Sequence, residues 1–390
     1  MTKIKKSEYI KISRTLVRKL YDETCFGKGS LYVENLKRGF PKEYVSKVQK
    51  QNNCNELHIK YDADSGCLFI VALNTIYHNR GNGGTRMKNY SSDEEGIEDA
   101  LRLANAMTKK YVIIGDEDNG GYSGGKAVII GNPETQKTPE MLRSYGRFVQ
   151  SLNGRFQTGC DINISPSDLE YMAKETQYVD GLPSIGIGDG GEATAYGVVV
   201  AMKTLCEQRY GNQSLKDRVI AVQGIGSVGS DLVRRLIEEG AEVIVTDVNS
   251  DRLKSFVDQY EVKSVSPEEI YSVSCDIFSP NACGDTLTAE NIEKLNCDLV
   301  IGAANNPLSA GLESVKQMQE RGIVFAPDYI VNIGAQVLAI CEVEGKSFDY
   351  ANSKIQEIIQ KRLQQLSLGN ESMYEVAERI VNKEILRNFR

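Results

Sequence analysis

The feature that most constrains the fold is a glycine-rich turn between a strand and a helix near the middle of the chain. Residues 218–223 form a short apolar run, and three glycines follow it in the spacing GxGxxG. A helical pattern comes next, and a second apolar run at 243–246 ends at Asp247. This order predicts a parallel strand–helix–strand unit whose turn approaches a ligand through main-chain atoms.

Each glycine of the turn has its own task. Gly224 permits the tight turn, Gly226 lets the backbone approach a pyrophosphate, and Gly229 lets the helix pack on the strand. The main-chain N–H groups of Ser227 and Val228, at the helix N-terminus, then face the phosphates. We interpret the turn as a dinucleotide site. The alternative is a tight strand-to-helix turn that binds nothing.

Asp247 indicates which dinucleotide is bound. It lies 18 residues after Gly229. A carboxylate at this position accepts hydrogen bonds from the adenosine ribose hydroxyls and repels a 2′-phosphate. The sequence therefore favours NAD over NADP as the cofactor.

Composition bounds the remaining possibilities. The 390 residues suffice for two domains, and the net charge of −7 gives no case for nucleic-acid or membrane partners. No apolar run approaches the roughly 18 residues of a membrane span, and the N-terminus lacks a signal-peptide core, so we expect a cytoplasmic protein. Nine cysteines without a CxxC pair suggest free thiols, and only two histidines, His58 and His78, are present. Both histidines are expected to be structural, and no metal site is expected.

The first 45 residues read as a basic extension. Residues 1–50 contain thirteen Lys and Arg against five Asp and Glu. Tyr9, Ile12, Leu16 and Leu20 recur at helical spacing. An amphipathic helix packed on the body or on another subunit is the favoured interpretation, and a docking arm for an acidic partner is the alternative.

The upstream half mixes strands and helices. We expect strands at 68–73, 111–114, 126–130 and 155–159, and helices from Ser92 to Lys110 and from Thr138 to Asn153. Ser92 and Glu95 form a capping-box pattern, with Ile97, Leu101, Ala104 and Met107 facing inward. A glycine-rich loop at 115–125 connects the first helix to the strand that follows.

The downstream half alternates strands with helices. A helix is expected from Thr194 to Gln208, and strands at 275–279, 298–303 and 323–326 follow the dinucleotide unit. The predicted fold class is α/β: a Rossmann-type, doubly wound parallel sheet plus an N-terminal α/β substrate and oligomerisation domain, with a cleft between them. The glycine-rich residues 183–192 are expected to act as a hinge. We place the domains at 1–45 for the extension, 46–185 for substrate, 190–345 for NAD and 346–390 for helices returning to the first domain.

Two lysines upstream of the dinucleotide unit are the candidate chemical groups. Lys126 lies between a diglycine and an apolar strand, where nothing local favours a charge, and Lys110 ends the preceding helix. If both converge on one cleft, repulsion and burial favour one neutral lysine that acts as a base, while the other holds a carboxylate. Asp161 follows a strand-like segment and could carry a proton. The alternative for either lysine is an exposed surface cation.

At these residues the chain resembles the glutamate/leucine/phenylalanine/valine dehydrogenase family, within it the leucine and tryptophan dehydrogenase branch. The resemblance covers about residues 50–390. The matching stretches are GGTRM at 83–87, IEDALRLA at 97–104, MTKK at 107–110, GGKAVIIGNP at 124–133, YGRF at 145–148, LNGRF at 152–156, TAYGV at 194–198, AVQG at 221–224, GAANN at 302–306 and APDY at 326–329.

The resemblance implies roles for individual residues. Lys110 would bind the substrate carboxylate with help from the Gly83–Gly84 backbone and beside Met107. Lys126 would activate water, and Asp161 would exchange protons with the amine. Thr194 and Asn332 would lie beside nicotinamide and substrate, and Asn305 against the cofactor.

Four features depart from the family pattern. An acidic insertion at 116–119 would keep Lys126 charged if it lay near that lysine, although a charged insertion is cheapest on a surface. Asn82 replaces an apolar residue that lines the side-chain pocket in relatives. Ile333 and Ala335 add bulk near the nicotinamide, and Glu192 replaces a small residue. Gly159 enlarges the side-chain pocket, so a large, aromatic substrate with a polar contact from Asn82 is favoured.

The predicted function is NAD-dependent oxidative deamination of a hydrophobic L-amino acid to the 2-oxo acid and ammonia, reversibly. The predicted enzyme is a homo-oligomer whose partners are these small molecules. Two alternatives remain open. One is a relative redirected to an unusual imine or amino acid in a specialised pathway, and the other is a cofactor-binding scaffold without turnover.

Overall fold

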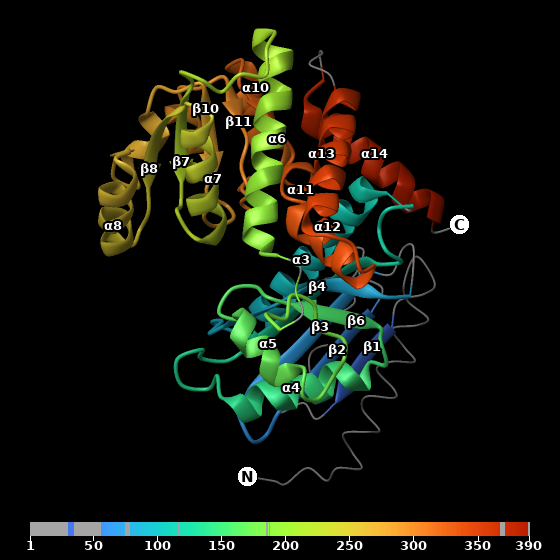
Figure 1. The fold of residues 1–390 in the computed structure, drawn as a ribbon. Coiled ribbons are helices and arrows are strands. Elements are labelled where there is room, and N and C mark those ends of the chain that lie inside the picture. The colour runs from blue at the N-terminus through green and yellow to red at the C-terminus, as the bar shows by residue number, and fades with distance from the viewer. Residues whose placement is uncertain are drawn as a thin grey trace. The chain divides into compact units, whose positions relative to one another are not determined.

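The computed structural model describes residues 30–34, 56–74, 79–115, 117–184, 186, 188–366 and 371–388. His78, Asp116 and nearly all of the basic extension lie outside these ranges. The chain divides into two compact units, Met1–Gly186 with Ile385–Arg390, and Ile187–Glu384 (Figure 1). Each unit is described by itself.

The first unit is built on a mixed sheet. Among its described residues the strand order is β1-β2-β3-β5-β4-β6, in which β2 and β3 pair antiparallel, as do β3 and β5. Strands β4, β5 and β6 run parallel to one another, so their carboxyl ends meet at one edge. The strand bounds are Ser30–Glu34 for β1, Glu56–Tyr61 for β2, Leu68–Asn74 for β3, Gly81–Lys88 for β4, Ser123–Ile130 for β5 and Phe156–Gly159 for β6.

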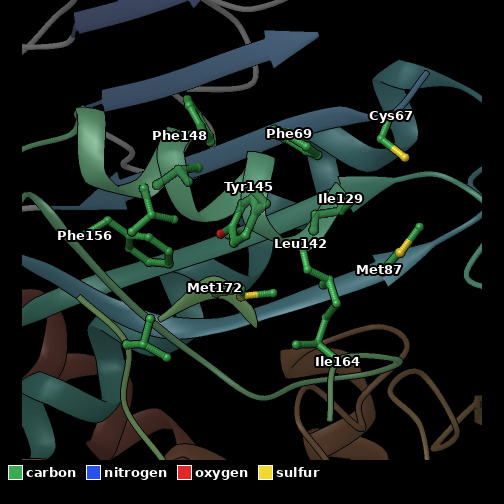
Figure 2. Close-up of a cluster of buried hydrophobic side chains, with 14 of the residues drawn as sticks. Cys67, Phe69, Met87, Ile129, Leu142, Tyr145, Phe148, Phe156, Ile164 and Met172 are labelled. Atoms are coloured by element: carbon green, nitrogen blue, oxygen red, sulfur yellow. The ribbon is translucent and has the colours of Figure 1, made fainter. Parts of the chain in front are cut away.

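Helices cover both faces of this sheet. Helix α3 (Asp93–Ile114) packs Ile97, Leu101 and Ala104 against one face. Helices α4 (Pro139–Ser151) and α5 (Pro166–Met172) cover the other face. Figure 2 shows the cluster on that second face, where the rings of Phe69 and Tyr145 meet edge to face with centroids 5.3 Å apart.

The expected strand at 111–114 is wrong. These residues form the last turn of α3, which ends at Gly115 with φ of 98°. Residues 111–114 are all buried, and a short apolar run of this kind does not distinguish a strand from a buried helical turn. Lys110 is therefore inside the helix and not at its end.

The helix N-termini follow the local signals. The hydroxyl of Ser92 accepts from the N–H of Glu95, and that of Thr138 accepts from the N–H of Met141. The return half of the expected capping box differs, because the carboxylate of Glu95 accepts from Ser91 and not from Ser92.

The second unit is a parallel sheet with the strand order β12-β11-β10-β7-β8-β9 over its described residues. The order reverses beside β7, as in a doubly wound fold. The strands are β7 (Val219–Gln223), β8 (Glu242–Thr246), β9 (Lys263–Ser264), β10 (Ile277–Pro280), β11 (Leu299–Val300) and β12 (Val324–Phe325). The mixed α/β class with a parallel Rossmann-type sheet is confirmed.

Helices surround the parallel sheet. They are α6 (Gly190–Tyr210), α7 (Ser227–Glu238), α8 (Ser250–Tyr260), the 3-10 turn η1 (Glu269–Ser272), α9 (Ala289–Lys294), α10 (Leu312–Glu320), α11 (Asp328–Val331), α12 (Gly334–Val343), α13 (Phe348–Gln365) and α14 (Met373–Asn388). Helix α6 packs on α7, α12 and α13, and Figure 1 shows α6 between α7 and α13.

One helix boundary differs from the sequence-based one. Helix α6 begins at Gly190, because the carboxylate of Asp189 accepts from the N–H groups of Gly191 and Glu192. In the second unit α13 packs on α6 and α12. The return of the helices after residue 346 to the first domain stays a prediction.

The described part of the chain holds no helix long and apolar enough to cross a membrane. It also holds no cluster of three or more His, Cys, Asp or Glu side chains that could bind a metal ion. The seven described cysteines are free thiols.

Candidate active site

The diglycine of β4 brings three chain segments into close contact in the first unit. A Cβ atom on Gly84 would overlap the main-chain oxygen of Cys160 and lie 3.2 Å from Cβ of Asp161. A Cβ atom on Gly83 would overlap the Gly125 carbonyl and lie 3.5 Å from the Met107 side chain of α3. Side chains are excluded here, so main-chain groups of β4 lie directly beside Asp161 and α3.

Lys126 and Asp161 form a buried ion pair beside this diglycine. The ammonium group of Lys126 contacts the Asp161 carboxylate, and their side chains are 9% and 16% exposed. Lys126 lies on β5 and Asp161 lies just after β6. The two predicted chemical groups are therefore brought into direct contact, within reach of a proton transfer.

Arg86 is a second cation on Asp161, and sequence reasoning gave it no role. Its guanidinium lies 3.5 Å from the Asp161 carboxylate and 3.0 Å from that of Asp99. Burial alone would raise the pKa of Asp161, but the charges of Lys126 and Arg86 outweigh it and hold that pKa well below its usual range. Asp161 is thus kept ionised. The signal was available, because Arg86 stands two residues after the diglycine.

Lys110 lies on α3 and is 4% exposed. Met107, which approaches Gly83, lies three residues earlier, so both side chains are on the face of α3 that meets β4. A Cβ atom on Gly124 would overlap Thr108, so α3 and β5 pack with no side chain between them. The expected role of Lys110 as a carboxylate ligand stays a prediction.

The structure describes residues 117–119 of the acidic insertion, and these three residues differ in their exposure to solvent. Glu117 is exposed, Asp118 is half-buried, and Asn119 is buried with its side-chain oxygen accepting from Gly121. Lys126 pairs with Asp161, which lies outside the insertion.

Asn82 and Gly159 lie next to a buried carboxylate that the sequence did not reveal. The side-chain amides of Asn82 and Gln157 donate to different oxygens of Asp180, the second over 2.6 Å. We call Asn82, Gln157 and Asp180 the polar row, and all three are at most 8% exposed. A Cβ atom on Gly159 would lie 3.7 Å from the main-chain oxygen of Asp180, so Gly159 leaves open volume beside the row.

In the second unit the glycine turn has the geometry that its spacing predicts. Gly224 has φ of 89°, a Cβ atom on Gly226 would meet nothing within 4 Å, and one on Gly229 would overlap the Gly224 carbonyl. Gly226 is the N-cap of α7 and supplies no capping side chain. The first N–H groups of α7, from Ser227 and Val228, are thus available to an anion, which fits a dinucleotide pyrophosphate.

Asp247 is bound to the glycine turn. Its carboxylate accepts from the N–H groups of Ile225, over 3.0 Å, and Asn249, over 2.8 Å. The guanidinium of Arg252 lies 3.4 Å away. The acid directly follows β8 and also ties the glycine turn to that strand. The sequence did not predict the cation beside it.

Three further candidates belong to the second unit: Thr194 lies near the start of α6, Asn305 lies between β11 and α10, and Asn332 directly follows α11. The amide of Asn332 donates to Ala303 and to the side chain of Asn305, each over 3.0 Å. The hydroxyl of Thr194 donates to Gly190 and accepts from the N–H of Ala335. These bonds join the start of α12 to the first turn of α6.

Ile333, Ala335 and Glu192, which depart from the family pattern, make contacts within the second unit. Ile333 is fully buried, and a Cβ atom on Gly190 would lie 3.2 Å from that of Ala335. Glu192 pairs with Arg235 of α7 at 3.1 Å. The bulk at Ile333 and the charge at Glu192 are therefore accommodated by the packing of the second unit.

Known protein families match the chain in two parts, which correspond to its two units. The Glu/Leu/Phe/Val dehydrogenase dimerisation domain matches residues 53–178, and the Glutamate/Leucine/Phenylalanine/Valine dehydrogenase domain matches 186–251 and 244–385. Leucine dehydrogenase of Thermoactinomyces intermedius is 38% identical over 329 residues, which are 83% of this chain and 88% of the relative. Phenylalanine dehydrogenase of Caldalkalibacillus thermarum is 40% identical over 310 residues, 78% of this chain and 81% of the relative.

A solved structure resembles the whole fold. The structure of L-tryptophan dehydrogenase from Nostoc punctiforme matches this chain with a TM-score of 0.69 and 31% sequence identity. The match covers 89% of this chain and 99% of the tryptophan dehydrogenase chain. With both family domains matched in order, the chain belongs to the glutamate/leucine/phenylalanine/valine dehydrogenase family and is an amino-acid dehydrogenase, an oxidoreductase acting on CH–NH2 groups.

Proposed function

We propose that this protein catalyses the NAD-dependent oxidative deamination of a large L-amino acid to its 2-oxo acid and ammonia, and the reverse reductive amination. The observation that carries the proposal is the buried pair of Lys126 and Asp161 beside the diglycine of β4. A buried lysine within contact of an ionised carboxylate can pass a proton in either direction, as deamination requires.

The residues of the first unit divide the chemical work. Lys110 and the main-chain N–H groups of the diglycine hold the substrate carboxylate, which places Cα near Lys126. Bound NAD supplies the acceptor for the hydride that leaves Cα. The Asp161 carboxylate accepts a proton from the substrate ammonium group before the hydride leaves. Unprotonated Lys126 takes a proton from the water that attacks the resulting imine carbon. Asp161 then returns its proton to the amine, and loss of the hydroxyl proton as the C–N bond breaks gives the 2-oxo acid and ammonia.

Arg86 acts through Asp161. Its contacts with Asp161 and Asp99 hold the carboxylate in place and ionised between proton transfers. We assign it as a positioning residue, because its guanidinium contacts Asp161 and Asp99.

The cofactor assignment rests on the glycine turn and Asp247. A carboxylate at the end of β8 opposes a 2′-phosphate, which supports NAD, whereas Arg252 beside it would favour NADP. We expect a higher kcat/KM with NAD than with NADP, and Asp247→Ser should narrow the difference. A preference for NADP that is lost in Arg252→Ala would reverse the assignment.

A panel of amino acids watched by NADH absorbance tests the reaction. We expect turnover with Trp, Phe or Leu and none in Lys126→Ala, whose NAD binding is retained. Best activity with Val or Glu would contradict a large side-chain pocket at Gly159. NAD binding without turnover on a broad panel would favour the scaffold alternative.

The polar row favours a second candidate within the same chemistry. A buried acid next to the substrate position is not needed for an aliphatic side chain, so the enzyme could serve an unusual amino acid or imine. We also propose a homo-oligomer, supported by the match of residues 53–178 to a dimerisation domain. Light scattering on the full chain would show a mass near 43.2 kDa if it were a monomer.

A further inference from the structure

Two cysteines of the second unit lie opposite each other just before strands β10 and β11 begin. An isolated parallel bridge joins Ser274 to Asn296, with the same spacing along the chain as the residue pairs of β10 and β11. Cys275 and Cys297 directly follow the two bridged residues, so the register makes them partners. The N–H of Cys275 donates to the main-chain oxygen of Asn296 over 3.0 Å, which holds the two segments together at this point.

The thiols of these two cysteines are in contact. The side chains of Cys275 and Cys297 hydrogen-bond each other, and this contact together with burial raises the pKa of Cys297 well above its usual range. Both cysteines are half-buried and pack against the hydrophobic cluster that contains Phe278 and Leu295. Cys297 therefore keeps its proton and donates it to the sulfur of Cys275.

The spacing of neighbouring strands is close to the spacing that a disulfide needs. Adjacent strands lie about 4.7–4.9 Å apart, and the Cα atoms of disulfide-bonded cysteines are usually about 4.4–6.8 Å apart. The Cβ atoms of directly opposite residues are separated by about the strand spacing, which exceeds the roughly 3.8 Å of a relaxed disulfide. A bond between the two sulfurs is thus within reach but strained, and strained disulfides are the ones that are readily reduced again.

Metal binding does not account for the pair. Within the ranges that the structure describes, no group of three or more His, Cys, Asp or Glu side chains could hold a metal ion, whereas a structural zinc site has four ligands. The acids that follow the two cysteines are used in ion pairs. Asp276 pairs with Arg218, and Asp298 pairs with Arg209. The chemistry open to two touching thiols is thiol–disulfide exchange.

We propose that Cys275 and Cys297 are a site of reversible covalent modification, at which a small disulfide such as oxidised glutathione converts them to an intramolecular disulfide. The thiolate of Cys275 attacks one sulfur of the oxidant, a mixed disulfide forms, and one glutathione thiolate leaves. The sulfur of Cys297 then attacks the sulfur of Cys275, and the second glutathione leaves. The two protein thiols are oxidised, the oxidant is reduced to two glutathione thiols, and the two protons of the pair end on those thiols.

The disulfide closes a segment that contains β10 and α9. A cross-link restricts the unfolded chain, so the oxidised form is more resistant to heat. The cysteines precede the amino ends of β10 and β11, whereas the glycine turn follows the carboxyl end of β7, which runs parallel to β10. The cross-link therefore lies at the opposite edge of the sheet from the glycine turn and leaves that turn unobstructed.

Packing alone is the competing interpretation of the pair. In that case the two thiols only fill the border of the hydrophobic cluster. An oxidant then reacts with exposed thiols such as Cys160 and leaves Cys275 and Cys297 unjoined.

Peptide mapping of the oxidised protein separates these interpretations. The test uses the full-length chain with Cys283→Ser, because Cys283 shares the tryptic peptide 264–294 with Cys275, while Cys297 lies in peptide 295–316. The folded protein is incubated with oxidised glutathione, at a concentration raised until the exposed Cys160 is modified. The remaining thiols are blocked with N-ethylmaleimide, and the digest is analysed by mass spectrometry without reduction.

We expect the two peptides to be joined, with both thiol hydrogens lost, and to separate again in dithiothreitol. The Tm of the oxidised protein should be at least about 2 °C above that of the reduced protein. Adding Cys275→Ser to Cys283→Ser is the matched control, which should show neither the cross-link nor the rise in Tm.

The results that overturn the proposal do not involve turnover, so they are independent of the proposed function. If Cys275 and Cys297 are recovered on separate peptides, as maleimide or glutathione adducts, while Cys160 has reacted with the oxidant, the disulfide site is refuted. A cross-link without any rise in Tm would refute the stabilising effect and leave the modification site in place.

Discussion

The diglycine of β4 and the glycine turn before α7 use the same device in different electrostatic settings. Gly84 and Gly229 each lie where a Cβ atom would overlap a carbonyl oxygen of another segment. Around Gly84 the neighbours are buried ions, Lys126 and Asp161. At the turn before α7, the groups that we propose to bind phosphate are main-chain N–H groups at the start of that helix.

The difference follows from what each region must do. Phosphates carry their charge throughout the reaction, so fixed main-chain dipoles suffice to bind them. Deamination moves protons, so the first unit needs side chains that change protonation state. Substitutions of charged side chains should therefore affect turnover in the first unit, and substitutions of glycine should affect nucleotide binding in the second.

The largest expected effect comes from Lys126. Replacing Lys126 with Met removes the group that we propose takes the proton from water, so kcat should fall by about 10²- to 10⁴-fold or below detection. NAD affinity, measured by fluorescence titration, should be unchanged. Lys137→Met is the control, because Lys137 pairs with Asp168 in the same unit and should retain activity. Normal turnover in Lys126→Met would refute its assignment.

The second test compares two glycines of one turn. Gly229→Ala places a methyl group against the Gly224 carbonyl and should cost about 1–3 kcal/mol of stability, with loss of NAD binding. Gly226→Ala meets open space, so its stability should change by less than about 0.5 kcal/mol. NAD affinity should nevertheless fall, because the methyl group lies where the pyrophosphate approaches. Unaltered NAD binding in both variants would argue that the turn binds no dinucleotide.

Substitution of Arg86 tests whether this cation controls the position and the pKa of Asp161. Arg86→Gln should lower kcat by about 10- to 100-fold through misplacement of Asp161. The pKa of Asp161 should rise when this cation is removed, so the acid limb of the kcat profile should move to higher pH. Arg102→Gln removes a more exposed partner of the same Asp99 and serves as the control. An acid limb that stays in place would show that Arg86 is only structural.

The smallest effect concerns a buried ionisable group away from the site. Burial lowers the pKa of His58 to about 4, although Glu56 lies 3.1 Å from its ring. In the unfolded chain the pKa of His58 is near 6.5, so the unfolded state binds the proton at a higher pH than the folded state does. The folding stability linked to neutral His58 is therefore fully present above pH 6.5 and is lost as the pH falls towards 4. Urea unfolding of the wild type at pH 7 and pH 5 should differ by about 1–2 kcal/mol more than that of His58→Gln. If the free energy of unfolding depends on pH equally in the wild type and in His58→Gln, folding does not lower the pKa of His58.

Elements with strong local signals were predictable. The apolar strands β3 and β5, the cap residues Ser92 and Thr138, and the turn before α7 all lie where the sequence places them. Caps and glycine turns are decided within a few residues, so their chemistry can be read from neighbouring positions. The last turn of α3 could not be predicted, because a short buried apolar run fits a helix and a strand equally well.

The candidate residues were predictable, but many of their partners were not. Lys110, Lys126 and Asp161 were recognised from residue type and from family resemblance. The pairing of Arg86 with both Asp99 and Asp161 depends on the packing of α3 and the end of β6 against β4. Neither contact has a local signature.

By itself the sequence determined the two-part α/β organisation, the glycine turn and the residue types available for chemistry. Only the tertiary structure decided which charges meet. Asn82 and Asp180 are 98 residues apart, and they touch because parallel strand pairing places β4, β6 and the segment after α5 side by side. Strand register over such separations is settled by the whole sheet and its buried faces, which no short window of sequence contains.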